Sequence, residues 1–280
     1  MYKFPIGVML DSFRDPIPEA MAKASRLGAH GMQMYAWNDY SPENVTPQKT
    51  RELLDMARSH GLVFSAVCGD FGIEFDDRER NKTLVERSKR VLEFAKSVET
   101  NIVTTHVGTI PADKNEERYK IIQEACFSLC EFADSMDAHF AIETGTESAD
   151  ILKAFLDDLH SRGVAVNFDP ANLTMQDPYG TVKDVYTLKD YIVHTHAKDA
   201  LNLSIHDEAT KAWYNQNAKV EDGIYTEVPL GRGDVPFPEY LKALEDIGYR
   251  GFLTVEREVG ADPSADIGEA VRYLNSLTGR

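Results

Sequence analysis

The feature of this 280-residue sequence that most restricts its fold is a repeated alternation of short apolar segments with longer amphipathic ones. Short apolar strands separated by helices are typical of a parallel sheet that is covered by helices. A closed (β/α)8 barrel, or TIM barrel, needs roughly 250 residues. The sequence therefore predicts an α/β fold with one barrel domain over residues 1–280, whereas an open doubly wound sheet rarely has eight strands so evenly spaced. The expected strands are residues 4–10, 31–36, 63–68, 102–106, 140–143, 164–169, 192–196 and a last one around Leu253.

The segments between these strands show helical spacing and helix-end signals. Residues 84–98 have apolar or small side chains at a 4-3-4-3 spacing, which predicts one buried helix face. Thr46 is a candidate N-cap, Pro47 occupies the first helical position, and Gly61 is a candidate C-terminal stop. Weaker helical patterns cover residues 182–188 and 238–247.

One long insertion, residues 201–230, follows the seventh expected strand. It is polar but includes Trp213, Tyr214 and Tyr225. In a barrel, the loops after the strands lie over the active-site face and commonly act as lids. Two interpretations stay open: a lid over the site, or a loop that only decorates the rim.

Composition excludes several kinds of partner. The net charge is −16, and a surface so acidic repels nucleic acid backbones and anionic membranes. No apolar run approaches the roughly 20 residues needed to span a bilayer. The first residues resemble the start of a strand rather than a signal peptide, and three cysteines without metal-ligand spacing fit a reducing compartment. We therefore expect a cytoplasmic protein that binds a small molecule, with no nucleic acid or membrane partner.

Charged residues end the later strands abruptly. The fifth expected strand ends in Glu143, the sixth in Asp169, the seventh in the pair His194 and His196, and Glu256 follows the eighth. A charge on a buried strand is costly unless it is paired or coordinated, and in a barrel these ends meet at one mouth. Three carboxylates and one imidazole meeting there predict a site for one divalent cation. Oxygen-rich coordination with one nitrogen suits Mn²⁺ or Mg²⁺, and Co²⁺ or Zn²⁺ can substitute.

The two histidines of the seventh strand lie two residues apart, so their side chains point to the same side of the sheet. His196 is nearer the carboxyl end and is the better placed of the two to reach into the mouth. His194 is expected to pack one layer deeper, or to orient a neighbouring ligand.

Taken together, these motifs resemble the sugar phosphate isomerase/epimerase family, the xylose isomerase-like TIM barrels that include ketose 3-epimerases, hydroxypyruvate isomerases and inosose dehydratases. The resemblance covers essentially the whole chain and is strongest in Asn-Phe-Asp-Pro, His-Thr-His-Ala-Lys-Asp and Gly-Phe-Leu-Thr-Val-Glu-Arg-Glu. It implies that one divalent metal ion, commonly manganese, is bound by four residues: Glu143, Asp169, His196 and Glu256.

The resemblance also implies a reaction. In the epimerases of this family, one glutamate removes a proton from the carbon next to a carbonyl and a second returns it, while the metal stabilises the enediolate. The matching catalytic residues here are Glu143 and Glu256. The function expected is that of a metal-dependent isomerase or epimerase of a ketose or related keto-sugar.

Four further residues are candidates for binding the substrate. His106 matches a strand-end histidine of the family and either contacts substrate or caps its loop. Asn172 stands where many relatives have a histidine, which puts proton transfer at that position in doubt. Arg232 either reaches a substrate oxygen or belongs to a turn. Lys198 either acts on substrate or forms a local ion pair with Asp199 that supports His196.

Other reactions remain open. A dehydratase or lyase acting on a keto-sugar or keto-inositol needs the same acidified C–H bond, and a non-catalytic sugar-binding barrel is a third possibility. The related apurinic endonucleases bind three metals, but here Cys68-Gly69-Asp70 and Asn172 replace expected ligands. The sequence favours a non-phosphorylated sugar, since it has no glycine-rich phosphate loop, and it leaves a homo-oligomer open.

Overall fold

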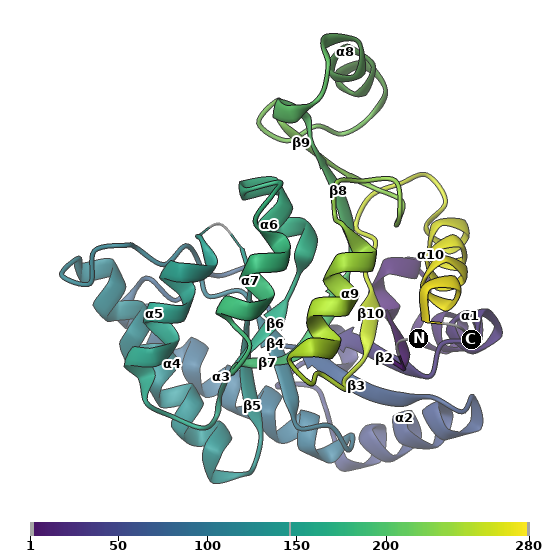
Figure 1. Cartoon of the computed structure of the whole chain (residues 1–280). Helices are drawn as coiled ribbons and strands as arrows, with labels where there is room; N and C mark the ends of the chain where they lie inside the picture. Colours follow the sequence, from purple (N-terminus) through teal and green to yellow (C-terminus); the bar gives the residue numbers. More distant parts are fainter. Residues whose placement is uncertain (1–2, 146, 279–280) are drawn as a thin grey trace.

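Parallel strands close into a barrel in the computed structural model, which describes residues 3–145 and 147–278. The order of neighbouring strands is β1-β10-β7-β6-β5-β4-β3-β2, and β1 pairs with both β2 and β10 to close the ring (Figure 1). The predicted (β/α)8 barrel is therefore confirmed. The strands are β1 (Ile6–Met9), β2 (Gly31–Tyr35), β3 (Val63–Cys68), β4 (Ile102–Thr105), β5 (His139–Glu143), β6 (Val164–Phe168), β7 (Ile192–Ala197) and β10 (Leu253–Val255).

Helices cover the outside of the barrel, and α2, α3, α5 and α6 begin at a residue whose side chain caps the helix N-terminus. Thr46 accepts a hydrogen bond from the backbone N–H of Lys49 at 3.2 Å, as expected of an N-cap. No helix in the described part of the chain is long and apolar enough to cross a membrane. The helices of this layer are α1 (Ile17–Leu27), α2 (Pro47–Ser59), α3 (Arg78–Ser97), α4 (Glu117–Ser135), α5 (Ala149–Leu159), α6 (Pro170–Gln176), α7 (Thr181–Thr187), α9 (Phe237–Asp246) and α10 (Pro263–Thr278).

The inside of the barrel contains a layer of buried polar side chains that hydrogen-bond across the lumen. Gln33 Nε2 donates to Thr104 Oγ1 at 2.7 Å. His194 connects two more strands, with Nδ1 2.8 Å from Asn167 Oδ1 and Nε2 2.9 Å from Thr254 Oγ1. Because each of these groups has a partner, the layer avoids the cost of burying unpaired polar atoms. Its members are Gln33, Ser65, Thr104, Asn167, His194 and Thr254.

The insertion after β7 is a folded arm rather than an irregular loop. Strands β8 (Asp199–Asn202) and β9 (Tyr225–Val228) form an antiparallel pair, and α8 (Glu208–Asn217) lies beyond them. Figure 1 shows this arm projecting away from the barrel. Leu201, Leu203 and Val228 form a small buried cluster, against which Tyr214 packs. We call residues 199–228 the hairpin arm.

Candidate metal site and cavity

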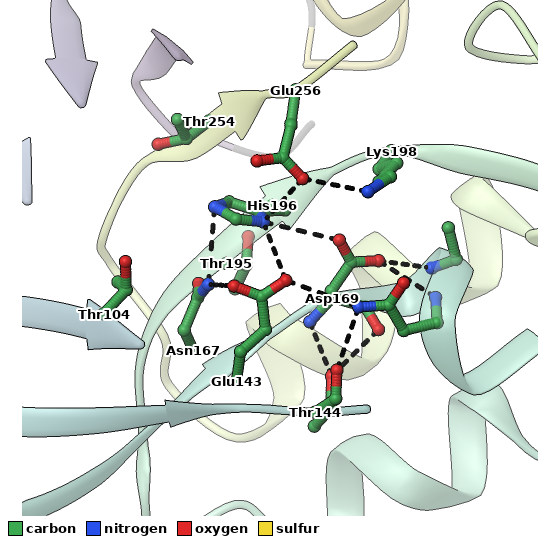
Figure 2. Close-up of polar contacts among 12 residues, drawn as sticks. Thr104, Glu143, Thr144, Asn167, Asp169, Thr195, His196, Lys198, Thr254 and Glu256 are labelled. Carbon is green, nitrogen blue, oxygen red and sulfur yellow. Dashed lines mark hydrogen bonds and ion pairs between the residues drawn. The ribbon is translucent and has the colours of Figure 1, made fainter. Parts of the chain in front are cut away.

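Four side chains converge at the carboxyl ends of β5, β6, β7 and β10. Glu143, Asp169, His196 and Glu256 are buried, and each offers one ligand atom within 4.8 Å of the others. His196 Nδ1 is at the centre, 3.3 Å from Asp169 Oδ2 and from Glu256 Oε2 and 3.5 Å from Glu143 Oε1 (Figure 2). The structure thus brings together all four residues that the sequence proposed as metal ligands.

Asp169 divides its two carboxylate oxygens between the helix α6 and the site. Oδ1 accepts the backbone N–H groups of Ala171 at 2.8 Å and Asn172 at 3.1 Å, so Asp169 is the N-cap of α6. Oδ2 faces His196. The cap explains why the chain turns into a helix directly after β6, which the sequence analysis did not predict. It also fixes the orientation of this carboxylate.

Glu143 is oriented by two asparagines. Asn167 Nδ2 donates to Oε2 at 2.8 Å, from the polar layer below. Asn172 Nδ2 donates to Oε1 at 3.3 Å and to the backbone oxygen of Thr144 at 3.0 Å. Asn172, a candidate substrate ligand, therefore contacts the carboxylate of Glu143 in addition to lining the cavity described below.

Glu256 forms an ion pair with Lys198. Lys198 Nζ is 3.1 Å from Glu256 Oε2 and also bonds Glu258 Oε2. Burial by itself raises the pKa of Glu256, but the positive charges of His196 and Lys198 outweigh it and lower the pKa below its usual range. Burial likewise opposes the charge of Lys198, yet the neighbouring carboxylates keep its pKa well above the ordinary value.

The ion pair of Lys198 with Asp199, one of the two interpretations left open by the sequence, is wrong: Lys198 lies between β7 and β8, and its ammonium group pairs with Glu256 and Glu258 instead. Asp199 instead accepts backbone N–H groups of the Leu-Gly-Arg-Gly-Asp segment, from Gly231 at 2.8 Å and Gly233 at 2.9 Å. This turn directs Arg232 outward, where it pairs with Glu269 at 2.8 Å and its side chain is 63% exposed. The structure therefore does not bring Arg232 to the site.

His106 lies at the edge of the same cluster. Its Nδ1 is 2.9 Å from Asp70 Oδ2, and its Nε2 is 3.5 Å from Glu143 Oε1. The negative charge of Glu143 and the bond to Asp70 together raise the pKa of His106 to about 9, against the opposing effect of burial. His106 is therefore held by a carboxylate on each side, and its side chain is half exposed to the cavity.

A cavity of about 650 Å³ borders this cluster at Glu143, and its volume is within the range of small-molecule sites. Glu143, His106, Asn172 and Lys198 lie on its wall. Glu147, which the sequence analysis missed, also lines it, and burial raises the pKa of its carboxyl to about 7. Four residues after Glu143 in a loop, it carries no sequence signal that distinguishes it from a solvent-exposed glutamate. The hairpin arm contributes Lys219, Glu221, Asp222, Tyr225, Thr226 and Glu227 to the lining.

The donor set fits a divalent cation. Three buried carboxylates that face one imidazole are strongly unfavourable unless positive charge balances them. Oxygen ligands of Mg²⁺ lie about 2.1 Å from the ion, so donors on opposite sides are about 4.2 Å apart. The observed span of up to 4.8 Å reaches this value with small side-chain movements. Glu143, Asp169, His196 and Glu256 are thus the residues that would bind such an ion.

Comparison with known proteins agrees with this fold. The family model of the xylose isomerase-like TIM barrels matches residues 21–277, and the chain belongs to that family. The structure is similar to a xylose isomerase domain protein from Planctomyces limnophilus, with 26% identity, a TM-score of 0.80, and 99% of this chain and 98% of that one covered.

Two solved structures with named activities share the fold at lower identity. One is a probable 3-DHS dehydratase, AsbF, from Bacillus anthracis, with 16% identity, a TM-score of 0.75, and 97% of this chain and 98% of that one covered. The other is 3-keto-D-glucoside 4-epimerase, YcjR, from E. coli, with 15% identity, a TM-score of 0.74, and 98% of this chain and 100% of that one covered.

Proposed function

We propose that this protein is a divalent-metal-dependent isomerase or epimerase of an uncharged keto-sugar. The observation on which this proposal mainly depends is the buried cluster of Glu143, Asp169, His196 and Glu256, in which Glu143 also lines a cavity large enough for a sugar. The 3-keto-D-glucoside 4-epimerase of the same fold supports the choice of reaction. Mn²⁺ or Mg²⁺ is the proposed ion, because three of the four donors are carboxylates.

The proposed chemistry begins with removal of a proton from the carbon next to the substrate carbonyl. The electron pair of that C–H bond moves onto the carbonyl oxygen and forms an enediolate. A divalent ion at the site would supply Lewis-acid stabilisation of this negative charge. Glu143, which lines the cavity, is positioned to accept the proton. Glu256, which faces His196 Nδ1 as Glu143 does, is the proposed second proton carrier. Return of a proton to the opposite face of the carbon gives the epimer, and return to the neighbouring carbon gives the isomer.

The charge of the cavity supports an uncharged substrate. Acidic side chains outnumber basic ones on its walls, and both lining lysines have carboxylate partners: Lys198 pairs with Glu256, and Lys219 lies 2.9 Å from Glu221. A phosphate group with a charge of about −1.5 to −2 would be repelled there. The acidic lining residues are Asp70, Glu74, Glu143, Glu147, Glu221, Asp222, Glu227 and Glu258.

A dehydratase is the second candidate function. Elimination starts from the same enediolate but expels a hydroxyl group from the next carbon, and the departing oxygen needs a proton. His106 lines the cavity 3.5 Å from Glu143 and is a suitable donor for that proton. The shared fold of the probable dehydratase AsbF is compatible with this alternative.

Deuterium exchange tests both candidates. The protein loaded with Mn²⁺ is incubated in D₂O with a panel of keto-sugars, keto-glycosides and their phosphorylated forms, and the products are analysed by NMR after the metal is removed. We expect deuterium next to the carbonyl of an unphosphorylated substrate, and no exchange after chelation. Glu143→Gln and Glu256→Gln should each lower the exchange rate by at least 100-fold, since general-base help is worth about 10²–10⁴-fold.

Glu93→Gln, a change of the same kind at an exposed helix position, is the matched control and should leave the rate unchanged. An epimer or isomer among the products supports the first function, and an unsaturated product supports the dehydratase. Exchange that persists in the chelated protein or in both site variants would exclude the proposed chemistry at these residues.

A further inference from the structure

The imidazole of His196 is held from two sides. Its Nδ1 faces the three carboxylates of the proposed metal site. Its Nε2 points into the polar layer of the barrel, where it lies 3.1 Å from Gln33 Oε1. His196 and Gln33 are both fully buried, so water does not replace this contact. The partner of Nε2 must therefore be found within the protein.

Gln33 supplies an acceptor that the other close neighbour of Nε2 does not. Asn167 Nδ2 is 3.3 Å from His196 Nε2, but this nitrogen is a donor and already donates to Glu143 Oε2 at 2.8 Å. A neutral imidazole has one N–H donor and one lone-pair acceptor. If Nδ1 is to offer its lone pair to a metal ion, the hydrogen must be on Nε2, and it then requires an acceptor such as the Gln33 carbonyl oxygen.

The direction of the Gln33 amide is set by β4. Its Nε2 donates to Thr104 Oγ1 at 2.7 Å, which turns the carbonyl oxygen toward His196. Thr104 is also fully buried. The chain of contacts Thr104–Gln33–His196 thus joins β4, β2 and β7 beneath the site, although these strands are not adjacent to one another in the barrel.

We propose that Gln33 is a positioning residue for the metal site: its carbonyl oxygen holds His196 with the hydrogen on Nε2, so that Nδ1 presents its lone pair to the divalent ion. This inference rests on the proposed metal-dependent function. Partners of this kind fix the tautomer and orientation of histidine ligands, and their loss typically lowers metal affinity by about 10–100-fold.

Two substitutions of Gln33 distinguish the effect of losing the acceptor oxygen from the effect of changing the side chain. Gln33→Met keeps a long unbranched side chain but removes the carbonyl acceptor, whereas Gln33→Glu retains an acceptor oxygen. Ser65→Ala is the matched control, because Ser65 belongs to the same buried layer but bonds Met32, Thr254 and His194 rather than His196. Circular dichroism and thermal unfolding establish that each variant is folded.

Zn²⁺ affinity is measured at pH 7 by competition with a chromophoric chelator. We expect Gln33→Met to bind Zn²⁺ about 10–100-fold more weakly than the wild type. Gln33→Glu should stay within about threefold of the wild type or bind more tightly, because carboxylates are common partners of histidine ligands. Ser65→Ala should also stay within about threefold. Wild-type affinity in Gln33→Met, or a loss in folded Gln33→Glu as large as in Gln33→Met, would overturn the proposal.

A second measurement does not depend on metal binding. NMR spectra of ¹⁵N-histidine-labelled metal-free protein should show a slowly exchanging His196 Nε2–H resonance in the wild type and in Ser65→Ala, and lose it in Gln33→Met. If the wild type binds no metal but shows this pattern, the metal site fails while the role of Gln33 in orienting His196 stands. If the resonance persists in Gln33→Met, Gln33 does not hold the ring.

Discussion

Glu147→Gln is expected to stabilise the metal-free protein, and by more as the pH rises. Glu147 is 7% exposed, and its carboxylate accepts a hydrogen bond from the backbone N–H of Ile110 at 3.4 Å. Burial raises its pKa from the ordinary value of 4.5 to about 7. Between these two values the folded protein retains a proton that the unfolded chain releases, so the wild type loses stability as the pH rises through this window.

The magnitude follows from the size of the shift. The pKa of Glu147 rises from 4.5 to about 7, a difference of roughly 2.5, and one pKa unit corresponds to about 1.36 kcal/mol. Above pH 7 the buried carboxylate therefore lowers the free energy of unfolding by about 3 kcal/mol. Glutamine has no charge to bury and keeps an oxygen that can accept the N–H of Ile110. The stability advantage of the variant should therefore be under about 1 kcal/mol at pH 5 and near 3 kcal/mol at pH 8.

Thermal unfolding with excess chelator at pH 5, 6, 7 and 8 measures this difference. For a chain of this size, 1 kcal/mol corresponds to roughly 2 °C, so the melting temperature of Glu147→Gln should exceed that of the wild type by about 6 °C at pH 8. Glu93→Gln, at an exposed position, should follow the wild type at every pH. Parallel curves for Glu147→Gln and wild type would refute the reasoning, because they would mean that the buried carboxylate ionises at no cost.

Three further predictions concern stability and the hairpin arm. Asp199→Ala leaves at least three backbone N–H groups without their acceptor and should cost more than about 3 kcal/mol in urea unfolding, with a smaller loss in Asp199→Asn; a loss below 1 kcal/mol would contradict this. Gly163→Ala places a methyl carbon 2.0 Å from the Cys130 carbonyl oxygen and should lower stability by at least about 2 kcal/mol in the same assay. Arg257→Met leaves Glu227 buried without its ion-pair partner and should accelerate amide hydrogen exchange in β8 and β9; unchanged protection would exclude this pair as the anchor of the arm.

The barrel was predictable from the sequence because each strand repeats the same local pattern. An apolar run flanked by helix caps, such as Thr46 before α2, needs no knowledge of distant residues. The meeting of Glu143, Asp169, His196 and Glu256 was also accessible, since the carboxyl ends of barrel strands share one mouth. In each case one geometric rule determines where the residues lie.

The remaining features depend on contacts between strands that are distant in sequence. Nothing adjacent to Gln33 indicates that it bonds His196, which is 163 residues later. The partner of Lys198 is Glu256, 58 residues later, and the acceptor role of Asp199 depended on a turn more than thirty residues away. The fold of the hairpin arm rests on the pairing of β8 with β9 across a polar segment, where hydrophobic periodicity is weak.

The orienting contacts of the four proposed ligands differ in one respect that bears on metal binding. For Asp169 and His196, one polar atom bonds a neighbour, namely the N-terminus of α6 or Gln33, while another faces the centre of the site. Glu143 bonds Asn167 through Oε2, but its Oε1 faces both His196 and the neutral amide of Asn172. Glu256 offers the same Oε2 to His196 and to the charged ammonium group of Lys198. A metal ion at the centre would therefore share this oxygen with the ammonium group of Lys198. Repulsion between the two cations would weaken the ion pair of Lys198 with Glu256. Lys198 can then pair with Glu258, its second partner, so we expect the wall of the cavity next to Glu256 to respond to metal binding.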